Sequence, residues 1–195
     1  YNTLSRKKEE FKAIPHPNPL LGKERGHKKV GLYTCGPTVY NYAHLGNLRS
    51  YVFEDILKRA LLYNGYKVKH VMNITDVDDK TIKESRRKYP DLSPRESLKK
   101  FTAEFEKCFW EDLIGLNISR PDAITRAADI KYIKKMQALV NNIYGQGYGY
   151  IKDGSVYFDV VKYSQKYKYG LLVDLDASKL KSGVRIDCVE YVLDI

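Results

Sequence analysis

The sequence predicts an α/β fold in which short buried strands alternate with helices. An apolar run at residues 30–33 ends in a turn that contains Cys35, Gly36 and Pro37, and a long stretch with helical periodicity follows. A second strand, at 66–74, with Val68, His70 and Met72 on one face, follows that helix, as expected for an open α/β sheet. The chain has 195 residues, 43% of them hydrophobic, which is enough for one domain or for a domain with an inserted piece.

The first part of the chain reads as an edge segment (1–11), a loop (15–27), a strand (28–33), a helix (47–64) and a second strand (66–74). The helix is predicted to end before Gly65, a residue suited to the position after a helix. Its apolar residues recur at helical spacing: Val52, Phe53, Ile56, Leu57, Ala60 and Leu61. In the second strand we interpret His70 as a residue packed at a sheet edge, because no partner lies at metal-ligand spacing.

The second part of the chain predicts helices and a hairpin. Ser93-Pro94 begins a helix that runs to Leu116 with an apolar stripe at helical spacing: Leu98, Phe101, Phe105, Phe109, Leu113 and Leu116. A second helix is expected at 124–144, and a hairpin at 148–158 that turns at Asp153-Gly154. Residues 163–175 are rich in Tyr and Lys, which suits either base stacking or a partly exposed strand edge.

The order strand, turn, helix at residues 30–61 favours a nucleotide site. A helix that begins near His44 presents free N–H groups and the positive end of its dipole to an anion such as phosphate. His44 can donate hydrogen bonds to phosphate oxygens, and Gly46 removes a side chain where a nucleotide could approach the backbone. His-x-Gly alone is a weak signal, and a simple helix entry explains it equally well.

A cluster of carboxylates follows the second strand. Asp76, Asp78 and Asp79 could hold Mg²⁺, bind ribose hydroxyls or cap the next helix, and we expect Asp79 to be the cap. Asn73 and Thr75 stand at the strand end itself, where ligands bind in open α/β sheets.

Composition narrows the class of protein. The net charge of +10 suits either a polyanionic partner or a solvated lysine-rich surface. Because the same chain has a predicted nucleotide site, RNA is the favoured partner. Three widely spaced cysteines imply no disulfide framework and no local zinc knuckle, and they suit a reducing cytoplasm. The polar N-terminus is not a signal peptide, and no run is long enough to cross a membrane. A start at Tyr1 and an end inside an apolar run lead us to expect part of a longer protein.

Several segments together resemble one family, the cysteinyl-tRNA synthetases of class I. The segment His44-Leu45-Gly46-Asn47 resembles the class I signature, usually His-Ile-Gly-His, and residues 34–40 resemble the version in which a cysteine ends the first strand. Residues 73–80 are similar to the family's second strand end, and residues 1–12 to its first segment. These segments occur in family order and cover nearly all of the chain.

The resemblance implies a Rossmann-like nucleotide-binding fold, of which this chain holds the first half, interrupted by an inserted α+β connective domain. The implied division is 1–87 for the catalytic half, 88–190 for the insertion and 191–195 for the return to the catalytic sheet. The implied activity is ATP-dependent activation of L-cysteine, with Mg²⁺ accompanying ATP, and transfer of the cysteinyl group to tRNA. The implied catalytic residues are His44 and Asn47, where Asn47 replaces the second family histidine. The implied ATP and adenylate contacts are Gly36, Pro37, Thr38, His44, Gly46, Asn47, Ser50, Asn73, Ile74 and Thr75.

The resemblance also implies that Cys35 is a zinc ligand. A thiolate binds zinc, and a zinc ion that binds the substrate sulfur distinguishes cysteine from serine by coordination. The other family ligands and the Lys-Met-Ser-Lys-Ser loop would lie beyond this chain, and we discount Lys179-Leu180-Lys181-Ser182 as a substitute. We therefore expect the isolated chain to be inactive. Two alternatives remain open: a related cysteine ligase with an amino-sugar acceptor, and a non-catalytic module that binds nucleotide or RNA.

Overall fold

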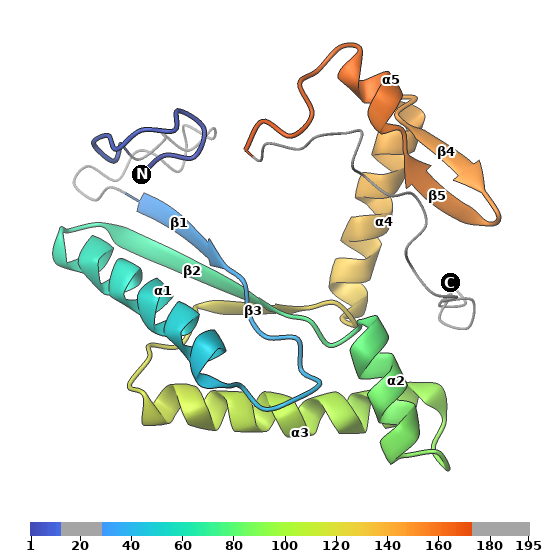
Figure 1. Ribbon diagram of the computed structural model, residues 1–195, viewed down its shortest axis with the longest axis horizontal. Helices are drawn as coiled ribbons and strands as arrows, with labels where there is room; N and C mark the ends of the chain where they lie inside the picture. Colours follow the sequence, from blue (N-terminus) through green and yellow to red (C-terminus); the bar gives the residue numbers. More distant parts are fainter. Residues whose placement is uncertain (13–28, 173–195) are drawn as a thin grey trace. The chain divides into compact units, whose positions relative to one another are not determined.

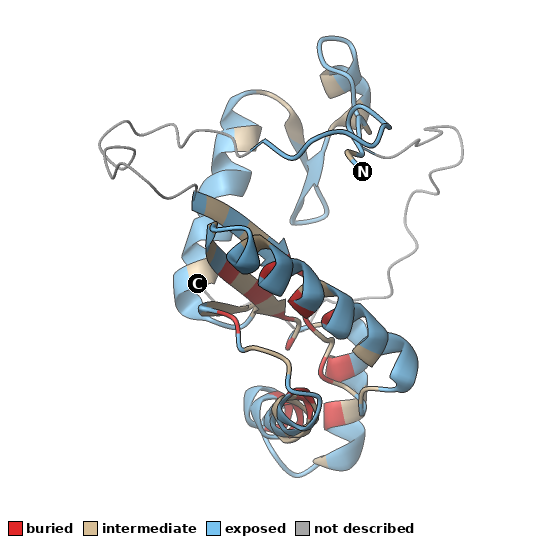
Figure 2. Ribbon diagram, turned by 90° about the vertical axis from the view of Figure 1, so that its left-hand side faces the viewer, coloured by how far each residue is buried: buried red, intermediate tan, exposed pale blue. Residues whose placement is uncertain are grey.

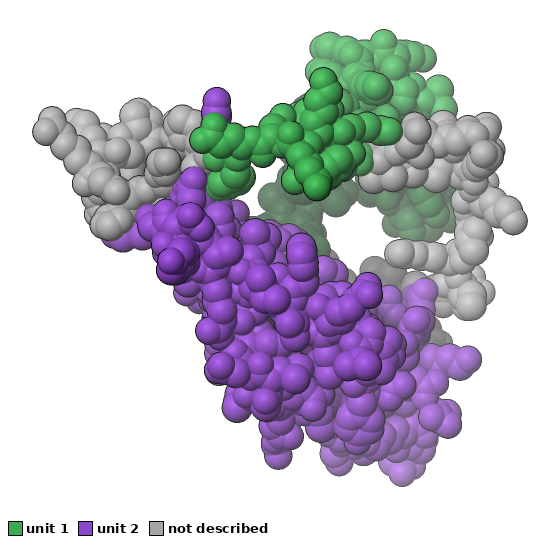
Figure 3. Space-filling view, turned by 60° about the vertical axis from the view of Figure 1, so that its left-hand side comes forward, with its two compact units in different colours: residues 1–11, 134–195 green, residues 12–133 purple. Residues whose placement is uncertain are grey.

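The computed structural model describes residues 1–12 and 29–172. The chain divides into two compact units, one of residues 12–133 and one of residues 1–11 and 134–195 (Figure 3). The first of these units contains more of the described residues and is called the larger unit. It holds every described residue that the sequence predicts for the nucleotide site.

The larger unit is an α/β structure built on three parallel strands in the order β1-β2-β3 (Figure 1). The strands are β1 (Lys29–Thr34), β2 (Lys67–Ile74) and β3 (Ala123–Arg126). The helices are α1 (Leu45–Tyr63) between β1 and β2, and α2 (Asp79–Lys88) and α3 (Pro94–Gly115) between β2 and β3. Parallel neighbours need such crossover helices, so the alternation predicted from the sequence is confirmed.

The core lies where β2, α1 and α3 meet. Its buried members are Val39, Tyr51, Met72, Ile74, Phe109 and Leu113. The ring centroids of Tyr51 and Phe109 are 5.1 Å apart in an edge contact, which joins α1 to α3. The helix predicted from Ser93 is present, and most of its apolar stripe is buried, although Leu116 is 46% exposed.

The apolar residues of α1 that recur at helical spacing do not form its buried face. Tyr51, Asp55 and Lys58 are the buried residues of this helix. Phe53 and Ile56 are 68% and 58% exposed, and Figure 2 shows α1 largely exposed along its length. The apolar and the buried positions both recur at helical spacing, so periodicity alone could not decide which face meets the sheet.

The structure also corrects the helix expected at 124–144. Residues 123–126 form strand β3, and helix α4 (Ile130–Gly145) begins only afterwards. Asp122 sets this register, because its backbone N–H donates to the carbonyl of His70 at 2.9 Å and its Oδ2 accepts from the N–H of His70 at 2.7 Å. His70 itself lies on the central strand with 3% of its surface exposed, so its placement at a sheet edge is wrong.

The smaller unit contains the predicted hairpin. Strands β4 (Gly149–Lys152) and β5 (Ser155–Phe158) pair in antiparallel register, and both turn residues have positive φ, 50° at Asp153 and 76° at Gly154. Asp-Gly is favoured in two-residue turns of this kind. A short helix, α5 (Val160–Ser164), follows, so Tyr163 lies in a helix rather than at a strand edge.

The domain division expected from the family differs from the compact units. The larger unit extends to Ile133, and β3, which the sequence division assigns to the insertion, pairs with β2. The boundary between 87 and 88 stays a prediction about the family's architecture. The predicted return at 191–195, the segment 179–182 and Cys188 lie outside the described residues.

Candidate nucleotide and amino-acid site

The ends of β1 and β2 are joined by backbone hydrogen bonds. The N–H of Thr75 donates to the carbonyl of Pro37 at 3.0 Å, and the N–H of Val39 donates to the carbonyl of Thr75 at 3.2 Å. Thr38 and Thr75 thereby form an isolated parallel bridge. The loop after β1 therefore continues the pairing with the end of β2, and it places residues 36–38 beside residues 73–75.

Gly36 is required at this junction for a steric reason. A Cβ on Gly36 would lie 1.8 Å from the carbonyl oxygen of Asn73, well inside contact distance. Its N–H donates to Asn73 Oδ1 at 3.3 Å, and the same oxygen accepts from the Tyr33 hydroxyl at 3.0 Å. Asn73 Nδ2 donates to Thr75 Oγ1 at 3.2 Å. Asn73 therefore holds the two strand ends together.

Helix α1 begins with a cap built by two of the predicted site residues. His44 Nδ1 accepts from the N–H of Gly46 at 3.1 Å, and Asn47 Oδ1 accepts from the N–H of His44 at 3.2 Å. Because Nδ1 is an acceptor here, neutral His44 carries its proton on Nε2, and the Asn47 amide keeps its N–H donors. The first turn contains no acidic residue. This helix end can therefore offer a phosphate two side-chain donors and the helix dipole.

Gly46 has a second reason to lack a side chain. A Cβ at this position would lie 3.0 Å from His44 Cε1 and 3.1 Å from Nδ1. Any larger residue would displace the imidazole that caps the helix. Gly46, His44, Asn47 and Ser50 are all exposed, so this end of α1 is open to a ligand.

Cys35 lies directly after β1 with an exposed thiol. Its Sγ makes only a long contact, 3.6 Å, with the carbonyl oxygen of Gly36. Tyr51, one of the buried residues of α1, interacts electrostatically with this thiol. Burial raises the pKa of Tyr51 to about 12, with smaller contributions from the charges of Glu54 and Cys35. Cys35 is thus near the second turn of the helix that His44 caps.

The described residues do not form a complete metal site. Across residues 1–12 and 29–172 no group of three or more His, Cys, Asp or Glu side chains could hold a metal ion. A structural zinc site needs four ligands, so Cys35 fits zinc only as one of several.

The remaining predicted residues have structural roles. Ile74 is 1% exposed and packs in the core, so its side chain does not face an open site. Asp78, and not Asp79, caps α2, where its Oδ1 accepts from the N–H of Lys80 at 3.0 Å. Asp76 accepts from the N–H of Ala128 at 3.0 Å, and burial raises its pKa.

A polar cluster under α1 was not predicted from the sequence. Thr34 Oγ1 and His70 Nε2 are 2.8 Å apart, and burial followed by the nearby Lys58 lowers the pKa of His70. Burial raises the pKa of Glu54, and its Oε2 is buried without a hydrogen-bond partner among the described residues. The only sequence signal is the helical spacing of Tyr51, Asp55 and Lys58 itself.

Comparisons with known proteins bear on this site. The family model described as "tRNA synthetases class I (C) catalytic domain" matches residues 22–191. The chain is 45% identical over 195 residues to a protein of Chlamydia trachomatis serovar D named cysteine–tRNA ligase, covering all of this chain and 36% of that protein. A protein of the same name from Brachyspira hyodysenteriae is 42% identical over 183 residues, covering 94% of this chain and 34% of that protein.

A solved structure shows the fold. The chain superimposes with a TM-score of 0.53 and 22% identity on a leucyl-tRNA synthetase of Agrobacterium radiobacter K84, crystallised with tRNA and LeuAMS. The superposition covers 66% of this chain and 16% of the other. The Rossmann-like arrangement predicted from the sequence is thereby confirmed. In the described part of the chain, no helix is long and apolar enough to span a membrane.

Proposed function

Since the chain belongs to the family of class I (C) tRNA synthetase catalytic domains, we propose that it supplies the first half of a site that activates L-cysteine with ATP and transfers it to tRNA. The chain spans about a third of the length of the curated relatives it matches, 36% of the Chlamydia trachomatis protein. The activity is therefore proposed for the complete protein, and the isolated chain is expected not to complete the reaction.

The observation that carries the proposal is the capped start of α1. In the proposed reaction the carboxylate of cysteine attacks the α-phosphate of ATP, and the bond to pyrophosphate breaks. Negative charge grows on the leaving pyrophosphate. His44 Nε2–H and the Asn47 amide would donate to it, and the helix dipole would add to the stabilisation. The reaction needs little covalent work from the protein, because position and charge carry it.

The strand ends would hold the other parts of the adenylate. The loop 36–38 and residues 73 and 75 form one edge, and the lack of a side chain at the exposed Gly46 leaves the backbone there accessible. Ser50 lies one turn further along α1. In the second step the tRNA's terminal hydroxyl attacks the carbonyl carbon of the adenylate, and AMP leaves.

Cys35 would be one thiolate ligand of a zinc ion completed by residues outside the described part of the chain. Such an ion would select a thiol amino acid by binding its sulfur. What this chain itself contributes is an exposed, unpaired thiol next to the capped helix.

The test is cysteine-dependent exchange of pyrophosphate into ATP by the complete protein, together with its zinc content. We expect exchange with cysteine and not with serine, and loss of both exchange and zinc in Cys35→Ser. Unchanged zinc content and exchange in that variant would contradict the role of Cys35. AMP release that depended on an amino sugar and not on tRNA would assign the acceptor to the related ligase, and absence of exchange with every amino acid would favour a binding module.

A further inference from the structure

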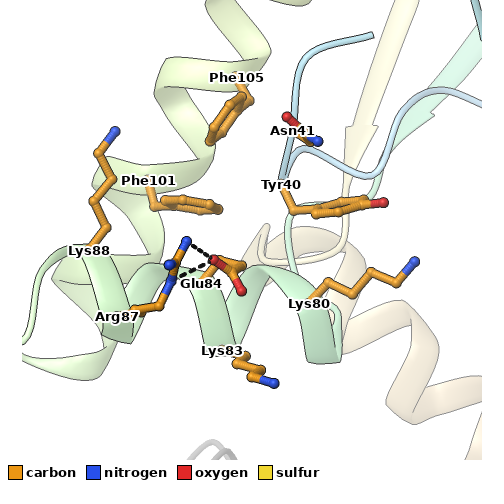
Figure 4. A pocket seen from close by; sticks show the side chains of 9 residues that line it. All are labelled: Tyr40, Asn41, Lys80, Lys83, Glu84, Arg87, Lys88, Phe101 and Phe105. Carbon is orange, nitrogen blue, oxygen red and sulfur yellow. Dashed lines mark hydrogen bonds and ion pairs between the residues drawn. The ribbon is translucent and has the colours of Figure 1, made fainter. Parts of the chain in front are cut away.

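A pocket in the larger unit is lined by none of the residues assigned to the nucleotide site. It has a volume of about 680 Å³ and is bounded by the loop after β1, by α2 and by α3 (Figure 4). Its lining combines three aromatic rings, Tyr40, Phe101 and Phe105, with a row of charged side chains from α2. The volume is within the range of pockets that hold small ligands, about 300–1,000 Å³.

Four cations line this pocket and only one carboxylate does. Two of the cations are neutralised by ion pairs. Arg87 pairs with Glu84 at 2.7 Å, as the dashed lines in Figure 4 show, and Lys88 pairs with Glu104.

Lys80 and Lys83 remain uncompensated. Neither has a carboxylate partner among residues 1–12 and 29–172, and both are exposed. Lys80 Nζ lies 4.9 Å from the ring centroid of Tyr40, a cation–π contact that keeps this charge beside an aromatic ring. The two lysines are three positions apart on α2, so their flexible side chains can reach the same anion, with Lys83 turning back from the direction shown in Figure 4, where it points away from the aromatic rings.

The aromatic residues provide a surface for a flat ring. Phe101 is 4% exposed and forms one side of the pocket, whereas Tyr40 and Phe105 are only half-buried. Figure 4 shows the rings of Tyr40 and Phe101 on opposite sides of the opening, with Phe105 above Phe101. Uncompensated lysines beside partly exposed aromatic rings are the combination that binds single-stranded nucleic acid, where bases stack and phosphates meet cations.

We propose that this pocket binds an unpaired nucleotide of RNA, with its base against Tyr40 and Phe105 and its phosphate at Lys80 and Lys83. The proposal rests on the proposed function for the identity of the polyanion, because that function makes RNA a substrate. The binding itself needs neither adenylate formation nor Cys35, so each proposal can fail without the other.

The test is fluorescence anisotropy of the 195-residue chain with a short labelled single-stranded RNA, measured over a range of salt concentrations. We expect Lys80→Ala/Lys83→Ala to bind more weakly, and its plot of log affinity against log salt to be shallower by about 0.7, which corresponds to one neutralised phosphate on a single strand. Tyr40→Leu should weaken binding at least about fivefold and leave the slope unchanged, because it removes a stacking ring and no charge.

The matched control is Lys134→Ala/Lys135→Ala, which removes the same charge from exposed positions of α4 that do not line the pocket and that have no carboxylate partner among the described residues. Equal effects of the two double variants would overturn the proposal, since binding would then depend on net charge alone. An affinity for duplex RNA equal to that for single-stranded RNA would also overturn the proposal. Complete displacement of the labelled RNA by an equal concentration of ATP would overturn it as well. Circular dichroism identifies any variant that fails to fold, and Phe105→Leu then repeats the stacking test at a second ring.

Discussion

Replacing Gly36 with alanine should destabilise the larger unit by about 1–3 kcal/mol. The new methyl group would lie 1.8 Å from the carbonyl oxygen of Asn73, so either the loop or the end of β2 must move by more than an ångström. If the loop lifts away, it loses three hydrogen bonds: Gly36 N–H to Asn73 Oδ1, Thr75 N–H to Pro37 and Val39 N–H to Thr75. At about 1 kcal/mol net each, the loss is about 3 kcal/mol. If the neighbours shift instead, overpacking costs about 1–3 kcal/mol.

The assay is urea unfolding of the chain followed by circular dichroism. Gly31→Ala is the matched control, because Gly31 lies on β1, just before the loop that holds Gly36, and a Cβ there meets nothing within 4 Å. It should be neutral or stabilise by up to about 1 kcal/mol, since glycine weakens a strand relative to alanine. A Gly36→Ala free energy of unfolding within about 0.5 kcal/mol of the parent chain would refute the steric argument.

Three further predictions concern α1. Asp55→Ala should cost about 2–3 kcal/mol in urea unfolding at neutral pH, because Asp55 accepts hydrogen bonds from Ser119 and Arg59. Burial alone would raise the pKa of Asp55, but those hydrogen bonds outweigh burial and lower it. The stabilisation by Asp55 is therefore present above the ordinary aspartate pKa of about 4, and it should fade as pH falls through the lower pKa of the folded state. A difference between Asp55→Ala and the parent chain that stayed constant from about pH 7 to about pH 3 would contradict this. Burial raises the pKa of Glu54, so the contribution of this group to stability is greatest at low pH and is lost as pH rises through its pKa in the folded state. Glu54→Gln should therefore be more stable than the parent chain at about pH 7, and the difference should shrink on acidification. A variant less stable than the parent chain at neutral pH would disprove the reasoning. His44→Ala should lose the helix cap and lower the free energy of unfolding by about 0.5–2 kcal/mol. His44→Asn should keep the cap but not restore pyrophosphate exchange in the complete protein. Full exchange in either variant would show that His44 is not part of the site.

Much of the fold follows from local signals in the sequence. Ser93-Pro94 with Glu96 starts α3 as predicted, because capping chemistry is local, and Gly65 follows α1 with a φ of 79°. The hairpin at Asp153-Gly154 is confirmed for the same reason. These elements depend on neighbours within one turn of the chain, so their residues suffice to predict them.

The errors come from contacts distant in sequence. Residues 123–126 form a strand because β2 offers them a free edge and Asp122 bonds to His70, 52 positions earlier. The buried face of α1 is polar because Asp55 meets Ser119 and Lys58 donates to the carbonyl of Arg120. No local pattern records such partners.

The candidate site was predicted in part. Its motif residues identify the capped start of α1, but the reasons for Gly36 and Gly46 lie in distances to Asn73 and to His44 that only coordinates give. The pocket lined by Lys80 and Lys83 was not predicted, since its residues come from three separate segments.

The amide of Asn73 has a consequence for how substrates would arrive. One side chain accepts from the segment next to Cys35 and donates to Thr75, so a molecule that displaces either bond alters the energy of the other. Two ligands that reached these neighbouring strand ends would then not associate independently. The affinity for the amino acid would then depend on whether the nucleotide is bound, and the affinity for the nucleotide would depend on the amino acid by the same factor.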